Sequence, residues 1–364
     1  PAFAATSNVD IYGVMSYSVD RANTDDSTID DTDLVTGRDN VSRIGFKGSE
    51  DLGGGLSAIW QIEMMLNSNQ PDTITTTSGL KFTVGSNTYR NTFVGLKSGS
   101  MGTLILGRHD TPYKLATGKL DPFADTVGDY NALIGRSSGT SAGSLFDVRA
   151  TQTVAYISPT FSGFHAAAAY VQVKNIESNV ADDDVSGWSL MGMYDNGPLF
   201  ASLAYEKHTG ILGANQFSST GFASDSIGAW KAGLGYSFGN TKIGGVYEKI
   251  SGGDNNGATV GGEANARKVW YLSAQHNMGA IALKAAYGRA GDSDATATAN
   301  DGAKFYALGA DYSLSKRTTV YGVYTKLNND GTSTAGGGYD LAPYSSSAVG
   351  NDPSAFSVGV KHTF

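Results

Sequence analysis

The chain has 364 residues, with 48 glycines, 8 prolines and no cysteine, and its texture is the same from end to end. The lack of cysteine excludes a disulfide scaffold, and the net charge of -8 argues weakly against nucleic-acid binding. Hydrophobic residues are only 40%, less than a soluble protein of this size normally needs for its core, and no run approaches 18 apolar residues.

The first segment, residues 1–7, reads PAFAATS. Ala2-Phe3-Ala4 has the small-x-small pattern of a signal-peptidase site, so this segment is interpreted as a signal-peptide remnant or an N-terminal extension. A scar of cloning is the alternative. Residues 8–364 are predicted to form a single barrel domain.

From residue 8 onward, segments of about ten residues alternate between apolar and polar positions, the length that a tilted strand needs to cross a bilayer. Their number is sixteen, and an even number is what a closed antiparallel barrel requires. The predicted strands are 8–20, 41–50, 55–66, 89–97, 102–109, 148–158, 163–174, 185–195, 198–208, 226–238, 241–251, 265–277, 280–290, 302–315, 318–327 and 354–364.

The connections between these strands alternate in length. Short turns rich in Gly, Asn, Pro or Ser face long polar loops, as in outer-membrane barrels. The long loops are 21–40, 67–88, 209–225, 252–264 and 328–352. Tryptophans near strand ends fit the aromatic girdles of such barrels: Trp60, Trp188, Trp230 and Trp270. Ordinary amphipathic β-structure with aromatics in a core is the alternative.

Several blocks of the chain carry a family resemblance, among them VDIYGVMSYSVD (9–20), SRIGFKGSEDLGGGLSAIWQIE (42–63), RNTFVGLKSGSMGTLILGRHDTP (90–112) and SVGVKHTF (357–364). These blocks resemble the trimeric general porins of the Gram-negative outer membrane, in their beta-proteobacterial branch. The resemblance implies a closed all-β barrel of 16 antiparallel strands through which ions and small hydrophilic solutes diffuse. It implies no cofactor and no catalysed reaction, and it identifies Phe364 as part of the signal read during barrel assembly.

The longest connection spans about residues 110–147 and follows the fifth predicted strand. It is too apolar for a free surface loop, because it contains Leu115, Leu120, Phe123, Leu133 and Phe146. A loop of this length is either disordered or functional. The resemblance implies that it folds into the lumen as the constriction loop.

Charged rings at a narrow point give such pores their selectivity. Alternation places Arg43 and Lys47 on the inward face, opposite Ile44 and Phe46. It also places Arg90 opposite Asn91 and Phe93, and Arg149 opposite Val154 and Tyr156. The family's cluster of wall arginines is carried over onto Arg43, Arg90 and Arg149, although each could instead be a solvated residue away from the narrowest point.

Acidic partners are expected from the loop. Asp121, Asp125 and Asp129 recur every four residues, so a helical turn would align them on one face. Glu63 and Arg136 are further candidates for the constriction. A structural or arginine-paired role is at least as plausible for each acid as contact with permeating ions.

Three arginines on rigid strands predict a modest anion preference. The rival hypotheses are a substrate-specific outer-membrane channel and, with less support, an outer-membrane barrel enzyme or a β-adhesin. No metal site is predicted, because the Asp-rich stretches 23–33 and 181–185 match no calcium loop and the five histidines lack metal-ligand spacing.

The expected partners are two further copies of the chain, outer-membrane lipid and lipopolysaccharide, and the permeating ions, with no nucleic acid. Gly13, Gly45 and Gly95 leave room for close packing on the N-terminal strands. The trimer is therefore expected to use the outer faces of 8–20, 41–109 and the last strand, with loop 67–88 latching onto a neighbour.

Overall fold

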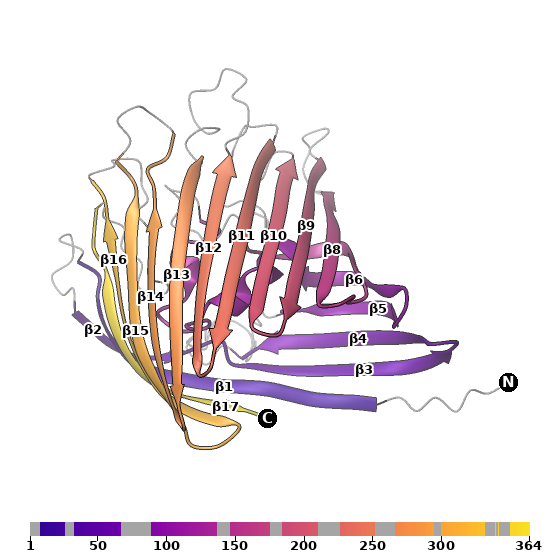
Figure 1. The fold of residues 1–364 in the computed structure, drawn as a ribbon, viewed down its shortest axis with the longest axis horizontal. Helices are drawn as coiled ribbons and strands as arrows, with labels where there is room; N and C mark the ends of the chain where they lie inside the picture. The colour runs from indigo at the N-terminus through magenta and orange to yellow at the C-terminus, as the bar shows by residue number, and fades with distance from the viewer. Residues whose placement is uncertain are drawn as a thin grey trace, which may run out of the picture.

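A computed structural model describes residues 8–25, 33–66, 89–136, 146–174, 184–209, 226–251, 266–294, 300–331, 339, 341 and 350–364. Its strands form one antiparallel sheet (Figure 1). Their bounds are β1 (Asn8–Asn23), β2 (Asp33–Asp39), β3 (Arg43–Gly53), β4 (Leu56–Met65), β5 (Thr92–Ser98), β6 (Gly102–Asp110), β7 (Arg149–Ile157), β8 (Phe164–Lys174), β9 (Asp184–Asn196), β10 (Leu199–Thr209), β11 (Ser226–Phe238), β12 (Thr241–Ser251), β13 (Arg267–Met278), β14 (Ile281–Ala290), β15 (Ala303–Ser313), β16 (Thr318–Asn329) and β17 (Ser354–Thr363).

The sheet closes on itself, because β1 pairs with β17 on one side and with β2 and β3 on the other. β2 faces the second half of β1 and β3 faces its first half, so the two form one wall strand that is interrupted at residues 40–42. Counted in this way, the barrel has sixteen wall strands, which confirms the predicted fold class. Closure leaves no unpaired edge, as a wall in lipid requires.

The predicted loop 21–40 is wrong in part, since β1 continues to Asn23 and β2 occupies Asp33–Asp39. Most of β2 is exposed and polar, so the sequence shows no apolar face there. The interruption after β2 is fixed by Asn40, whose side-chain amide donates to Ser18 Oγ at 2.8 Å and to the Tyr321 hydroxyl at 2.9 Å. Val41, with φ 60°, makes the turn into β3.

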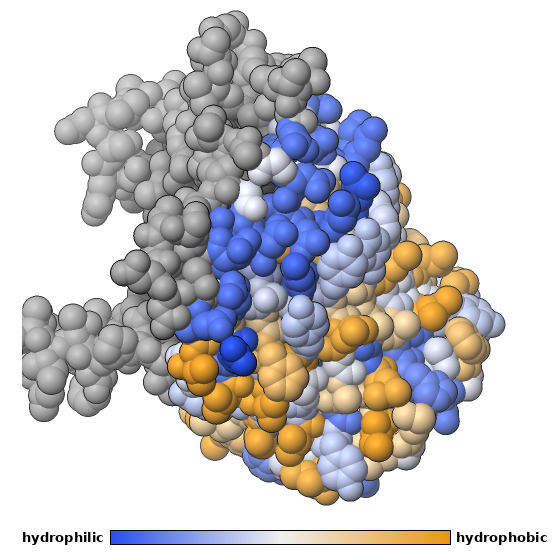
Figure 2. Space-filling view, turned by 90° about the vertical axis from the view of Figure 1, so that its left-hand side faces the viewer, coloured by the Kyte–Doolittle hydropathy of each residue, from blue (hydrophilic) through white to orange (hydrophobic). Residues whose placement is uncertain are grey.

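The two faces of the wall differ as the alternation predicts. Outward side chains remain apolar and exposed, as for Leu203 (59%), Leu234 (60%) and Leu308 (59%), whereas inward neighbours such as Ala204 and Ala307 are buried. Figure 2 shows the result as a hydrophobic band below a hydrophilic zone on one side of the barrel. Among the described residues, no helix is long and apolar enough to cross a membrane.

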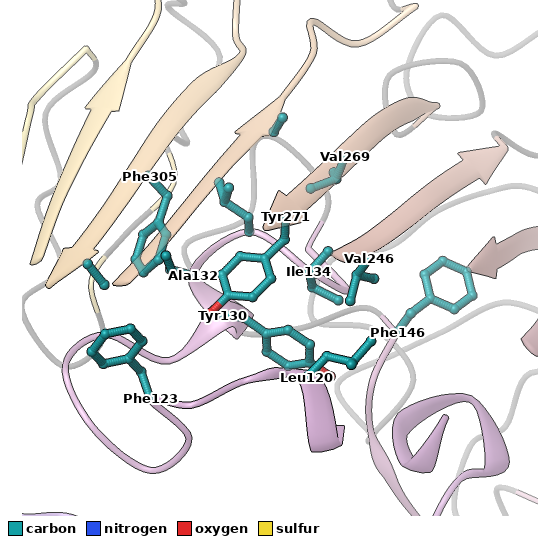
Figure 3. Close-up of a cluster of buried hydrophobic side chains, with 14 of the residues drawn as sticks. Leu120, Phe123, Tyr130, Ala132, Ile134, Phe146, Val246, Val269, Tyr271 and Phe305 are labelled. Atoms are coloured by element: carbon teal, nitrogen blue, oxygen red, sulfur yellow. The ribbon is translucent and has the colours of Figure 1, made fainter. Parts of the chain in front are cut away.

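The connection between β6 and β7 is the inserted loop, residues 111–148. It contains a short helix α1 (Pro112–Leu115) and two 3-10 turns, η1 (Gly118–Leu120) and η2 (Tyr130–Ala132). Its apolar side chains turn toward the wall formed by β11 to β16 (Figure 3). Leu120, Phe123, Ile134 and Phe146 lie in one buried cluster with wall residues that include Val246, Val269, Tyr271 and Phe305.

Buried polar contacts hold the loop against the same wall. The Tyr113 hydroxyl donates to Glu248 Oε1 at 2.7 Å, and the Gly135 amide donates to Glu248 Oε2 at 2.8 Å. Lys231 on β11 forms a buried ion pair with Asp147 near the end of the loop. Each of these wall charges has a partner on the loop, which is the condition for keeping charges buried at acceptable cost. The loop therefore leaves the opposite wall, β1 to β7, facing the open lumen.

The closing seam of the barrel depends on a glycine. Gly13 and Phe364 exchange backbone hydrogen bonds of 3.1 Å in both directions. The Phe364 ring lies where a side chain on Gly13 would project, and a Cβ there would also lie 2.6 Å from the Arg43 carbonyl oxygen. Arg43 belongs to β3, so Gly13 brings the first, second and last wall strands together.

Replacing Gly13 by alanine is expected to destabilise the barrel by about 1–3 kcal/mol, because backbone as well as the Phe364 ring must move. Gly322→Ala is the matched control: Gly322 also lies in a wall strand next to β17, and a Cβ there meets nothing within 4 Å. Thermal unfolding in detergent measures both. Equal stability of the two variants would show that the seam tolerates the extra carbon.

Candidate functional site

Each wall arginine predicted from the sequence has a carboxylate partner in the structure. Arg43 at the start of β3 donates from Nη1 to Asp125 Oδ2 at 2.9 Å, and its Nη1 also donates to the Val41 carbonyl at 3.1 Å. Asp125 belongs to the inserted loop, so this pair joins the loop tip to the wall strand on the far side of the lumen. Both side chains keep partial exposure, 19% for Arg43 and 28% for Asp125, as expected for groups that border water.

The second pair is Arg90 with Glu63. Arg90 Nε donates to Glu63 Oε1 at 2.6 Å, and the Tyr12 hydroxyl donates to Oε2 at 2.9 Å. Glu63 is buried on β4, so its charge is matched by one cation and one hydroxyl. Three wall segments, β1, β4 and the residues before β5, are thereby joined at one carboxylate.

The third pair is Arg149 with Asp110, at the two ends of the inserted loop. Arg149 Nη2 lies 2.9 Å from Asp110 Oδ1, and Arg149 Nε donates to Asn91 Oδ1 at 2.7 Å. Asn91 in turn donates from Nδ2 to Asp110 Oδ2 at 3.0 Å. This closed set of contacts fixes the point at which the chain leaves β6 and returns to β7.

Sequence reasoning missed a fourth arginine, Arg108 on β6. It interacts electrostatically with Arg90, Arg149 and Asp110, and its buried Nε has no hydrogen-bond partner. Strict alternation from the buried Ile105 assigns Arg108 to the lipid face. The pairing of β6 with β7 is irregular between Gly107 and His109, and Gly107 has φ 143°, so alternation fails at this point. Gly107, directly before Arg108, was the one sequence signal that the strand could be irregular at this point.

The alternation argument for Arg90 was also wrong. β5 begins only at Thr92, so Arg90 is not part of the strand. The outward residues of β5 are Val94 and Leu96. Phe93, which was expected to face outward, instead packs inward against the buried Ile105 and Ala155. Arg90 therefore precedes the strand. It reaches Glu63 because its own amide donates to the Glu63 carbonyl at 2.8 Å, which holds the two residues side by side.

The three loop aspartates do not share one face of a helical turn, so that expectation is wrong. Asp121 accepts from the amides of Phe123 and Tyr130 and from the Tyr271 hydroxyl. Asp129 accepts from the amides of Asn131 and Asp125. Both carboxylates organise turns of the loop, and only Asp125 meets a wall arginine. Burial, with the nearby charge of Asp129, raises the pKa of Asp121 well above its usual range.

Of the two remaining candidates, Lys47 lies next to Tyr12 of the second pair and Arg136 lies inside the loop. The Lys47 ammonium on β3 lies 5.3 Å from the centre of the Tyr12 ring and is exposed. Arg136 is buried within the inserted loop, where its Nε donates to the Asn131 carbonyl at 2.8 Å. Lys47 can therefore contribute charge to the lumen, whereas Arg136 stabilises the fold of the inserted loop.

A cavity of about 420 Å³ adjoins the tip of the inserted loop. Asp125 lines it together with Lys284, Asp311, Lys361 and Tyr321 from strands β14 to β17. Lys284 and Asp311 form an ion pair of 2.8 Å across β14 and β15. Charged groups of both signs thus surround the space next to the Arg43–Asp125 pair, with Lys361 as an additional cation.

Comparison with known proteins places this geometry in a family. A family model described as Gram-negative porin matches residues 1–332. The chain is 27% identical to outer membrane porin protein 32 of Delftia acidovorans, over 100% of the chain and 96% of that relative. A solved anion-selective porin from Comamonas acidovorans matches with a TM-score of 0.73 and 25% identity, covering 98% of the chain and 100% of that structure.

A trimer form of OmpT from Vibrio cholerae shares the fold at a TM-score of 0.64 and 17% identity, over 98% of the chain and 99% of that structure. The family model and the full-length relative confirm the resemblance to beta-proteobacterial porins. The chain belongs to the Gram-negative porin family, and its function is that of an outer-membrane channel for passive diffusion.

Proposed function

We propose that this porin has a modest preference for anions, set by the basic side chains of the wall opposite the inserted loop. The observation that carries the proposal is the surplus of cations there. Arg43, Arg90, Arg108 and Arg149 stand against three carboxylates, Glu63, Asp110 and Asp125, while Lys47 faces Asp10 across β1 and β3. The similarity to an anion-selective porin supports the same sign.

The overall charge of -8 does not oppose this proposal. Charges that are separated by more than about 8 Å of water are largely screened at physiological ionic strength, so acids in outer loops act weakly on an ion inside the channel. Side chains held beside a narrow, protein-lined passage act at short range. Asp121 and Asp129 would have offset the arginines from the loop, but their oxygens are bound by loop amides.

The same arrangement supports a general diffusion channel, and we propose that it catalyses no reaction. Residues 8–364 are proposed to act as one barrel domain, while residues 1–7, with their expected signal-peptide remnant, lie outside the described residues. Loop 67–88, which is expected to latch onto a neighbouring subunit, also lies outside the described residues. No contact described for the site favours a substrate-specific channel or an enzyme.

The double substitution Arg43→Ala with Arg90→Ala is expected to move the reversal potential in a potassium chloride gradient toward cations, far enough to change its sign. It removes two positive charges and leaves the carboxylates of Asp125 and Glu63 without their arginine partners. Planar-bilayer recording measures the shift.

Asp125→Asn is the matched opposite change and should strengthen the anion preference of the wild-type pore. A wild-type channel that is strongly cation-selective would show that carboxylates dominate and would contradict the assignment.

We further propose that the porin assembles as a trimer through the outer faces of the N-terminal strands and β17. Exposed apolar side chains on these faces support the proposal, among them Val9, Ile11, Val19 and Val358. Native mass spectrometry in mild detergent is expected to give three times the chain mass. In planar-bilayer recordings, the conductance steps should appear in groups of three, one for each subunit. A monomer as the sole species would refute the trimer.

Phe364 is proposed to act as an assembly signal as well as a closing residue of the seam. Deleting Phe364 is expected to lower the amount of barrel in the outer membrane severalfold, while molecules that do assemble keep nearly the wild-type conductance. Phe356→Ala on the same outward face of β17 serves as the control. An unchanged outer-membrane yield without Phe364 would disprove the assembly role.

A further inference from the structure

Glycines line the part of the wall against which the inserted loop packs. They lie on the inward face of β11, β12, β14 and β15, next to exposed outward residues such as Leu234 and Leu308. The side chains of Leu120 and Phe123 point from the loop toward this wall (Figure 3). An apolar side chain of the loop fills the space that each glycine leaves. We call these positions the glycine sockets: Gly233, Gly235 and Gly244 hold Leu120, Gly288 holds Leu133, and Gly309 holds Phe123.

The contacts in the sockets are too close to admit a side chain on the wall. A Cβ on Gly235 would lie 2.8 Å from Leu120 Cδ2, and a Cβ on Gly233 would lie 2.8 Å from Leu120 Cδ1. A Cβ on Gly288 would lie 2.8 Å from Leu133 Cδ1. Because carbon atoms in contact stay about 3.5–4.0 Å apart, one added methyl group would displace the loop by roughly 1 Å.

The socket for Leu120 also holds the backbone of the loop. Gly235 and Gly244 lie directly opposite each other across β11 and β12, so the space for the side chain spans two strands. The Leu120 carbonyl accepts a hydrogen bond from Ser273 Oγ at 2.6 Å, and the preceding carbonyl accepts one from Lys242 Nζ at 2.6 Å. Hydrogen bonds thus tie the loop to the wall at the point where the leucine enters the socket, so the depth of the leucine fixes the position of the backbone.

Glycine inside a strand weakens the strand, because it supplies no side chain for packing and loses more backbone freedom on folding than other residues. Its presence therefore indicates that another part of the chain comes close. Elsewhere in the barrel the close neighbour is an aromatic residue of an adjacent strand, as for Gly45 beside Tyr12 and Gly359 beside Tyr321. In the sockets the neighbour is the inserted loop.

We propose that the glycine sockets are positioning residues that set the width of the channel, because they fix how deeply the inserted loop is seated in the wall. The loop has this wall behind it and the open lumen in front, and Lys119, next to Leu120, is exposed. A side chain added to a socket therefore moves the loop into the lumen, toward the arginines of the opposite wall. The inference rests on the channel function and is independent of the ion preference proposed above.

Single-channel conductance in symmetric potassium chloride tests the inference. Gly235→Ala is the clearest substitution, because Leu120 is the one neighbour that its Cβ would meet at less than 3.4 Å. The variant is expected to lose conductance and to admit large sugars more slowly in liposome swelling. Gly192→Ala is the matched control: Gly192 is also a mid-strand glycine, but it lies on the outer face of β9, where a Cβ meets the Phe164 ring at 3.6 and 3.7 Å. It should keep the wild-type conductance.

A compensating change separates loop position from folding. Leu120→Val shortens the side chain that enters the socket, so it should restore the conductance of the Gly235→Ala channel, as expected for two residues in direct contact. Gly288→Ala with Leu133→Val repeats the experiment at a second socket.

Conductance is read from one assembled channel at a time, so a lower yield of a variant does not affect it. Wild-type conductance in both glycine variants would show that the sockets serve folding alone and would overturn the inference. A loss that the shortened leucines do not reverse, or an equal loss in Gly192→Ala, would overturn it as well. The reversal potential in a salt gradient reports the ion preference separately, so that proposal stands or fails by its own measurement.

Discussion

The structure depends on one constraint: a sheet in lipid must leave no backbone group unpaired. Pairing between β1 and β17 closes the sheet and meets this constraint. The seam between these strands has no room for a side chain at Gly13. Gly13 bonds to Phe364 in both directions while its missing side chain leaves room for the Phe364 ring and the Arg43 carbonyl. Since Arg43 also meets the loop through Asp125, the closing seam and the candidate site share a strand end.

The inserted loop divides the lumen into two unlike halves. Its apolar side chains and the buried charges of Lys231 and Glu248 belong to the β11–β16 wall, where every carboxylate oxygen that anchors the loop has a defined donor. Burying charges is tolerable only with such partners. Arg43, Arg90 and Arg149 of the other wall each meet one carboxylate and keep a smaller part of the side chain exposed, so they can act on ions in water. The same loop thus removes charge from one wall and leaves it available on the other.

Alternation in the sequence was sufficient for the fold and for part of the site. Each of the sixteen wall strands contains a predicted segment, because an outward apolar face and an inward small or polar face repeat with period two. The part that was missed is β2, one half of the second wall strand, which is mostly exposed and polar and so shows no alternating apolar face. Arg43 follows from alternation, whereas Arg90 precedes its strand. Arg108 and Arg149 both lie beyond the irregular pairing of β6 with β7, at Gly107 and Gln152, where alternation carries no information.

The sequence by itself determined the barrel, its strand number, the side on which the long loops lie, and the presence of wall arginines near an apolar inserted loop. These properties follow from the local periodicity and the composition of the sequence. Only the tertiary structure decided which carboxylate meets which arginine, because the partners are distant in the chain and are brought together by register and by the course of the loop. Asp121 and Asp129 look identical to Asp125 in sequence, yet loop amides bind the first two, and the third alone reaches across the lumen to Arg43.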